Sequence, residues 1–151
     1  MAVRVSPNDF DVGAEIDALT SGRRDIGALA TFTGLVRDMG GPAAVSGLEL
    51  EHYPGMTTRA LEAIEAEACA RWPLQASLIV HRHGVLLPGD RIVFVAAASP
   101  HRQAAFEAAM FMMDFLKSRA PFWKKETTAE GAHWVDAREI DEDALSRWQR
   151  I

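Results

Sequence analysis

Hydrophobic and polar residues alternate along several short stretches of the chain, and this period of two predicts half-buried strands. In the stretch SGLELEHY, Leu48 and Leu50 alternate with Glu49 and Glu51. Other stretches rich in β-branched and apolar residues predict further strands. We expect strands over residues 3–5, 28–37, 46–53, 76–84, 90–99 and 133–139.

Apolar residues three or four positions apart predict helices between these strands. We expect helices within residues 6–21, from the N-cap Thr57 to about Trp72, from Ser99 to about Arg119, and over 141–150 with Asp141 as its cap. In the third helix, Phe106, Met110, Met113 and Leu116 form the expected inward stripe, and Pro121 must end the helix because proline lacks the needed N–H. Without strict alternation of strand and helix, the pattern predicts an α+β fold with mostly antiparallel sheet.

Composition narrows this picture to one globular domain over residues 1–151. Apolar residues make up 48% and charged residues 25% of the chain, which is typical of a soluble protein. The run Ile92–Ala98 is too short to span a membrane, and the N-terminus lacks the features of a secretory signal. A net charge of -5 argues against a general nucleic-acid binder. The single cysteine, Cys69, fits a reducing compartment, so we expect a cytoplasmic protein.

The segment SPHR, residues 99–102, is a candidate anion site. Ser99 is a good N-cap and Pro100 is favoured at the first helical position, so His101 and Arg102 are expected in the first turn of the long helix. Positive side chains there oppose the helix dipole unless an anion is bound, which indicates phosphate or carboxylate. The alternative, that both side chains point into water, stays equally open.

The segment KSRAPFWKKE, residues 117–126, gathers positive charge at the other end of that helix. Lys117 and Arg119 suit a helix C-terminus, so they need no functional explanation. Lys124 and Lys125 follow two aromatic residues that should anchor them, and a lysine held beside apolar surface is suited to proton transfer or nucleophilic attack. Glu126 could orient one of them. A solvated basic turn is the alternative interpretation.

The sequence gives only weak evidence for a metal site, a nucleophilic cysteine or a nucleotide-binding motif. His81 and His83 share one face of a strand and His52 could join them, but histidines without a further ligand at a known spacing do not indicate zinc. Cys69 has acidic neighbours on its helix, which makes it a poor nucleophile. The sequence contains no GxGxxG, P-loop or GxSxG motif, so we expect no resident metal or cofactor.

Several of these segments, in order, resemble the large, catalytic subunit of molybdopterin synthase. They are TFTGLVR, LEHYPGM, HRHGVLLPGD, SPHRQAAFEA, DFLKSRAPFWKKE and HWVDARE. The resemblance implies insertion of two sulfurs into cyclic pyranopterin monophosphate to form the dithiolene of molybdopterin. It implies a sulfur donor, the thiocarboxylate on the C-terminal Gly-Gly of a small ubiquitin-like subunit. It also implies an α/β hammerhead fold and a central homodimer within a heterotetramer.

The resemblance also implies roles for particular residues. Lys117 and Lys124 match the lysines regarded as catalytic in that family. The residues matching its substrate-binding positions are Leu35, Val36, Arg37, His101, Arg102, Lys125 and Glu126. Many relatives carry a lysine where this chain has Leu35, so a contact there must use the backbone or be lost. Arg138 also matches a family arginine that the second subunit could supply.

Two questions stay open at this point. One alternative function is a binding module that holds a phosphorylated ligand or a partner's tail without chemistry, and another is acyl transfer to an amine. The second question is geometric, because a helix of about 19 residues is about 28 Å long. His101 and Lys117 can then share a pocket only if the helix is shorter or a neighbouring subunit contributes one of them.

Overall fold

The computed structural model describes residues 2–38, 47–128, 131–135 and 143–149. Its strands are β1 (Ala2–Ser6), β2 (Ala28–Leu35), β3 (Gly47–His52), β4 (Ala76–Arg82), β5 (Gly84–Leu86), β6 (Arg91–Ser99), β7 (Phe122–Thr128) and β8 (Gly131–Val135). Its helices are α1 (Val12–Thr20), α2 (Met56–Arg71), α3 (Arg102–Arg119) and the 3₁₀ helix η2 (Ser146–Trp148).

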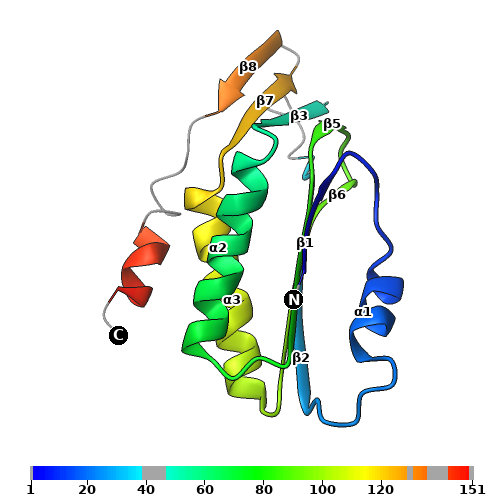
Figure 1. Ribbon diagram of the computed structural model, residues 1–151. Helices are drawn as coiled ribbons and strands as arrows, with labels where there is room; N and C mark the ends of the chain where they lie inside the picture. Colours follow the sequence, from blue (N-terminus) through cyan, green and yellow to red (C-terminus); the bar gives the residue numbers. More distant parts are fainter. Residues whose placement is uncertain (1, 39–46, 129–130, 136–142, 150–151) are drawn as a thin grey trace.

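The first sheet has strand order β1-β4-β6-β2, in which β1 and β4 are parallel and the other pairs antiparallel. Helices α2 and α3 cover one face and α1 covers the other (Figure 1). Side chains alternate accordingly, because Ile79 and Val95 pack toward α2 and α3 whereas Val80 and Phe94 pack toward α1. Both faces of the central strands are therefore buried.

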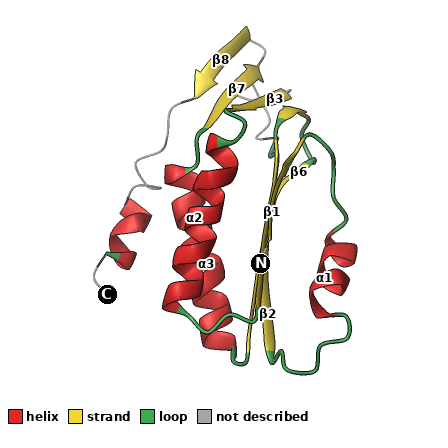
Figure 2. Ribbon diagram, in the orientation of Figure 1, coloured by secondary structure: helices red, strands yellow, loops and turns green. Residues whose placement is uncertain are grey.

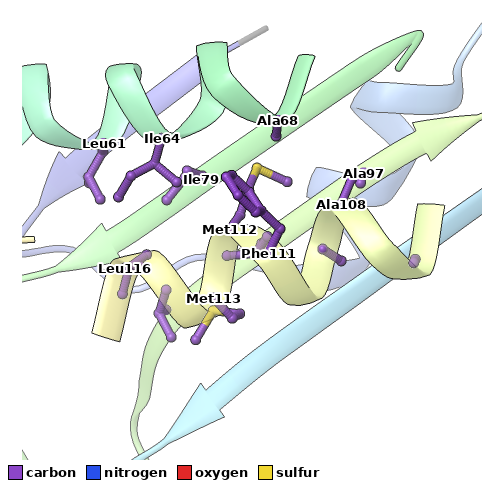
Figure 3. Close-up of a cluster of buried hydrophobic side chains, with 14 of the residues drawn as sticks. Leu61, Ile64, Ala68, Ile79, Ala97, Ala108, Phe111, Met112, Met113 and Leu116 are labelled. Carbon is purple, nitrogen blue, oxygen red and sulfur yellow. The ribbon is translucent and has the colours of Figure 1, made fainter. Parts of the chain in front are cut away.

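The main core lies between this sheet and the pair α2 and α3 (Figure 3). Leu61, Ile79, Phe111 and Met112 in this core have no measurable exposure. Small residues such as Ala108 let α3 approach the sheet closely. The 3₁₀ helix η2 packs Trp148 against the same core.

The second sheet has strand order β5-β3-β7-β8, with antiparallel neighbours throughout. It lies across the C-terminal end of α3, whereas the N-terminal end of α3 lies at the far end of the molecule (Figures 1 and 2). Leu48 and Leu50 of β3, which alternate as the sequence predicted, are buried against Leu86 and Val36. The second sheet thus has its own small core beside the end of α3.

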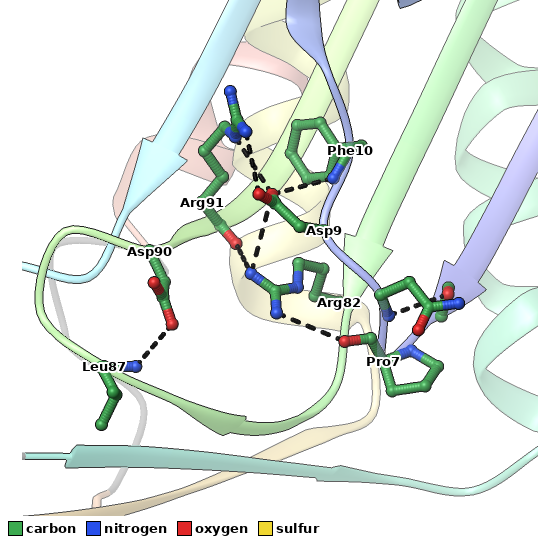
Figure 4. Close-up of polar contacts among 9 residues, drawn as sticks. Pro7, Asp9, Phe10, Arg82, Leu87, Asp90 and Arg91 are labelled. Carbon is green, nitrogen blue, oxygen red and sulfur yellow. Dashed lines mark hydrogen bonds and ion pairs between the residues drawn. The ribbon is translucent and has the colours of Figure 1, made fainter.

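A polar frame holds the end of β4 (Figure 4). Arg82 donates to the carbonyl oxygens of Arg91, at 3.0 Å, and Pro7, at 3.3 Å. Arg91 is paired with Asp9 at 2.8 Å, and this hydrogen-bonded guanidinium lowers the pKa of the Asp9 carboxyl to about 2. These bonds tie the segment after β1 to β4 and β6, so the chain around Arg82 is well fixed.

The start of α3 differs from the prediction. Strand β6 continues through Ser99, whose hydroxyl is buried and donates to the Pro73 carbonyl oxygen at 3.1 Å instead of capping the helix. His101 is the N-cap and its side chain makes no capping hydrogen bond. Of the two residues predicted in the first turn, only Arg102 therefore lies there. The tertiary pairing of Ser99 with the loop before β4 therefore overrides its capping preference.

The predicted inward stripe of α3 was wrong in two places. Phe106 is 65% exposed and Met110 is 48% exposed, whereas Met113 and Leu116 are buried as expected. Alanines such as Ala105 take the inward positions, because close approach of the helix to the sheet leaves no room for larger side chains there. The helix ends at Arg119, before Pro121, as predicted.

Three further boundaries needed correction. Helix α2 has Gly55 as its N-cap, and Thr57 is buried inside the first turn, where its hydroxyl lies 3.4 Å from the Pro121 carbonyl oxygen. The segment after Pro121, which could have been a basic turn, is strand β7. The predicted strand 76–84 divides at its end, because Gly84 begins β5 of the other sheet. The predicted cap Asp141 lies outside the described residues.

The α+β class with mostly antiparallel sheet is confirmed by these two sheets and their packed helices. No helix among the described residues is long and apolar enough to cross a membrane.

Candidate functional site

A cavity of about 500 Å³ opens where the two sheets meet the C-terminal end of α3. Its apolar wall includes Phe32, Leu50 and Phe122, and its positive side chains are those of the three residues Arg37, Lys117 and Lys124. The described lining contains no Asp or Glu side chain. The cavity is therefore suited to a ligand with an anionic group and an apolar or planar part.

Lys117 reaches the cavity from the last turn of α3, where a cation is favoured by the helix dipole. Lys124 reaches it from β7, where its backbone lies opposite buried Leu50 of β3. The sequence holds only three lysines, and two of them line this cavity. The structure thus brings together in one cavity the two lysines that the family resemblance indicated, although one belongs to a helix and the other to a strand.

Residues 35–37 approach the cavity from the end of β2. Leu35, 56% exposed, and Arg37 line it, whereas Val36 is buried in the small core of the second sheet. The Val36 N–H donates to the Asp90 carbonyl oxygen at 2.9 Å, and its carbonyl oxygen accepts from Gly89 at 2.8 Å. Both backbone groups of Val36 are used within the fold, so we expect Arg37 to make the ligand contact on this segment.

The other two predicted residues of β7 lie outside the cavity lining. Lys125 is paired with Glu49 across the strands, so strand alternation turns its side chain to the opposite face from Lys124. Glu126 lies two residues after Lys124 on the same face of β7 and is half-buried. Neither lines the cavity in a single chain.

His101 and Arg102 lie at the other end of α3 and are exposed. The 18 residues of α3 span about 27 Å, so one chain does not bring these two residues to Lys117. Their segment is nevertheless fixed, because the Gly27 N–H donates to the Ser99 carbonyl oxygen at 3.1 Å. A Cβ at Gly27 would lie 1.9 Å from the Pro100 carbonyl oxygen, so only glycine fits this close approach.

His81 lines the cavity, although its sequence pattern indicated only a possible zinc ligand. It is 5% exposed, its ring stacks on Phe122 with centroids 3.8 Å apart, and its Nδ1 lies 2.7 Å from the Arg82 carbonyl oxygen. Burial, followed by the charges of Lys117 and Lys124, lowers the pKa of His81 to about 3. The imidazole is therefore neutral at physiological pH. Its alternation with His83 along the chain was the only sequence signal for it.

The remaining candidates from the sequence lie apart from the cavity lining. His52 and His83 stack with ring centroids 4.2 Å apart, but no three potential metal ligands gather within the part of the chain that the structure describes. Cys69 lies on α2, where burial raises the pKa of its thiol and the Glu65 carboxylate raises it further. This thiol is a weak nucleophile, as the sequence suggested. Arg138 lies outside the described residues.

Comparison with known proteins identifies the family of this chain. A family model described as MoaE protein matches residues 5–119. The molybdopterin synthase catalytic subunit of Mesorhizobium japonicum is 58% identical over 149 residues, which cover 97% of this chain and 92% of that protein.

Solved structures agree with this result. The molybdopterin biosynthesis MoaE protein from Burkholderia ambifaria MC40-6 is 55% identical, covers 99% of both chains and has a TM-score of 0.85. A chain in the complex of subunits 1 and 2 of molybdopterin-converting factor from Helicobacter pylori 26695 has a TM-score of 0.74 over 90% of this chain and 91% of that one. At 19% identity this second likeness shows the fold alone. The chain therefore belongs to the MoaE family of molybdopterin synthase catalytic subunits, which are sulfurtransferases.

Proposed function

We propose that the chain transfers sulfur from the C-terminal thiocarboxylate of a small ubiquitin-like subunit to cyclic pyranopterin monophosphate, which yields the dithiolene of molybdopterin. The observation that carries this proposal is the cavity that holds Lys117, Lys124 and Arg37 without a carboxylate in its described lining. A thiocarboxylate and a phosphate are both anions, so such a lining attracts both reactants.

The two lysines are proposed to act on the reacting end of the tail. When sulfur passes to the pterin, water must replace it on the carbonyl carbon, so that the tail leaves as a carboxylate. Two ammonium groups fixed in a partly apolar cavity stabilise the negative charge that develops on the carbonyl oxygen in this exchange. One of the lysines also passes protons as sulfur moves. Cys69 is not needed in this scheme, because the partner carries the sulfur.

Two copies of the chain are proposed to complete each site. His101 and Arg102 are the candidates for the phosphate, yet they lie about 23 Å from Lys117 along α3. In a homodimer with a two-fold axis, the start of α3 from one copy can meet the cavity of the other. A small subunit at each outer end would make a heterotetramer. We propose that this assembly works in the cytoplasm, which the single cysteine supports.

Replacement of Lys117 tests the catalytic role. With thiocarboxylated small subunit and pyranopterin substrate, we expect Lys117→Ala to lower the rate of dithiolene formation about a hundredfold or more, as removal of one charge-stabilising donor does in other enzymes. Arg119→Ala is the matched control, because Arg119 is an exposed cation in the same helical turn but lies outside the cavity lining. A near-normal rate for Lys117→Ala would remove the lysine from the mechanism. If wild type binds both ligands and forms no product, the chain is a binding module instead.

Complementation between two inactive variants tests the composite site. We expect Lys117→Ala and Arg102→Ala each to be inactive alone. In an equal mixture that exchanges subunits freely, half of the dimers are mixed and one site in each has both wild-type residues, so activity should return to about a quarter of wild type. A mixture as inactive as its components would show that Lys117 and Arg102 do not serve one site across two copies.

A further inference from the structure

His81 lines the cavity and carries a second ring nitrogen that the proposed chemistry has not used. The residue ends the buried part of β4, and its position two residues after Ile79 places it on the face of the sheet that α3 covers. Phe122 stacks on its ring at 3.8 Å with an interplanar angle of 18°. The ring is thus held on one side by β7 while it lines the cavity with Lys117 and Lys124.

The hydrogen bond to Arg82 defines which nitrogen of His81 carries the proton. A carbonyl oxygen can only accept, so Nδ1, 2.7 Å away, must donate to it. The Arg82 backbone is itself held by the frame of Arg82, Arg91 and Asp9, which keeps this bond in place. Because the ring is neutral, Nε2 carries a lone pair.

The positive charge of the cavity lining makes a neutral acceptor useful. The charged side chains of the described lining, Arg37, Lys117 and Lys124, can only donate, and apart from the Thr33 hydroxyl no other side chain there accepts. A carboxylate in the place of His81 would pair with the lysines and repel an anionic ligand. A neutral imidazole accepts a hydrogen bond without reducing the positive charge of the cavity.

We infer that His81 is a substrate-positioning residue whose Nε2 accepts a hydrogen bond from the last backbone N–H of a peptide tail, while Lys117 and Lys124 bind the tail's terminal carboxylate or thiocarboxylate. This inference rests on the proposed function. In a C-terminal residue the N–H lies only two covalent bonds from the carboxyl carbon, so both groups can meet one cluster of side chains. A terminal glycine has no side chain and so permits close approach of the tail's backbone to the cavity wall.

The test removes the N–H from the tail and the acceptor from the chain separately. A semisynthetic small subunit ending in Gly-Gly is compared with one in which an ester oxygen replaces the last N–H. Each is assayed with wild type, His81→Asn and His81→Gln. The amide nitrogen of the asparagine can still donate to the Arg82 carbonyl oxygen but leaves no atom near Nε2. The longer glutamine carries an oxygen acceptor to that place.

We expect the ester to raise the Kd of the small subunit and its KM about tenfold with wild type and with His81→Gln, the effect of one lost hydrogen bond. With His81→Asn, the amide tail should already bind about tenfold more weakly, and the ester should add no further loss. The KM for the pyranopterin should not change in any variant. Thermal melting of each variant separates lost binding from lost folding.

An equal ester effect in wild type and His81→Asn would overturn the inference, because the N–H would then be bonded elsewhere. Unchanged binding of the ester by wild type would also overturn it, and that measurement needs no variant to fold. Either result leaves the proposed function intact if wild type still forms dithiolene. Absence of both binding and turnover with wild type and the Gly-Gly subunit would overturn the proposed function and the inference together.

Discussion

Replacement of His81 by phenylalanine should make the folded chain less sensitive to acid. The folded pKa of His81 is about 3, against 6.5 for an ordinary histidine, because of burial and then the charges of Lys117 and Lys124. Unfolding exposes the ring, so below pH 6.5 the unfolded chain binds a proton that the folded chain does not. The stability from this neutral histidine is therefore fully present above pH 6.5 and is lost as pH falls toward 3.

The magnitude follows from this difference in pKa. Each pH unit below 6.5 should lower the free energy of unfolding by about 1.4 kcal/mol, so a change from pH 7 to pH 5 should lower it by about 2 kcal/mol in wild type. His81→Phe keeps an aromatic ring against Phe122 but cannot titrate. It loses the bond to Arg82, which shifts stability by a similar amount at every pH and does not change the slope.

The assay is urea denaturation at pH 7, 6 and 5, at one protein concentration, for wild type and His81→Phe. Other titrating groups contribute equally to the free energy of unfolding of both proteins, so their contributions cancel when one value is subtracted from the other. Examples are Glu65, whose pKa burial raises, and His83, whose pKa burial lowers. We expect the free energy of unfolding of wild type to fall by about 2 kcal/mol relative to that of His81→Phe from pH 7 to pH 5. Parallel pH profiles would show that His81 titrates normally in the folded chain, and its imidazole would then not be held neutral by burial and the nearby lysines.

Two further predictions concern packing away from the cavity. Gly27→Ala should destabilise the chain by about 3 kcal/mol or more, since its Cβ would meet the Pro100 backbone at 1.9 Å, while Gly47→Ala, with only Thr127 at 4.0 Å, should change the urea midpoint much less. Ser77→Ala should cost about 1–3 kcal/mol in the same assay, because the buried hydroxyl donates to the Glu65 carboxyl at 2.6 Å. Equal urea midpoints for Gly27→Ala and Gly47→Ala would contradict the steric role of Gly27. An unchanged urea midpoint for Ser77→Ala would contradict the stabilising role of its hydrogen bond.

The sequence predicted the elements well where side-chain periodicity reflects burial on one face. Leu48 and Leu50 alternate because only one face of β3 is buried, and that signal is local. The inward face of α3 was harder, because alanines such as Ala105 fill it while Phe106 and Met110 point outward. Small residues carry little hydrophobic signal, so a helix that packs closely on a sheet can hide its buried face from pattern analysis.

The sequence also predicted those site residues that a local motif marks, but not those whose position depends on residues far away along the chain. Lys117 and Lys124 were recognised as candidates from their motif, but the motif does not say that a strand begins at Phe122. His81 was missed as a cavity residue because its burial depends on Phe122, which is 41 positions away along the chain. The separation of Arg102 from Lys117 was foreseen from helix length, since that quantity is fixed by geometry alone.

The junction between α3 and β7 is what joins the two lysines in one cavity. The helix ends with the Ala120 N–H donating to the Leu116 carbonyl oxygen at 3.3 Å, and the Phe122 N–H then donates to the Ala120 carbonyl oxygen at 2.9 Å. From Phe122 onward, side chains alternate between the faces of β7, so Lys124 faces the cavity and Lys125 does not. One residue more or fewer in this junction would exchange the faces of every following side chain. The number of residues between Lys117 and Lys124 in KSRAPFWK therefore determines that both side chains reach the same cavity.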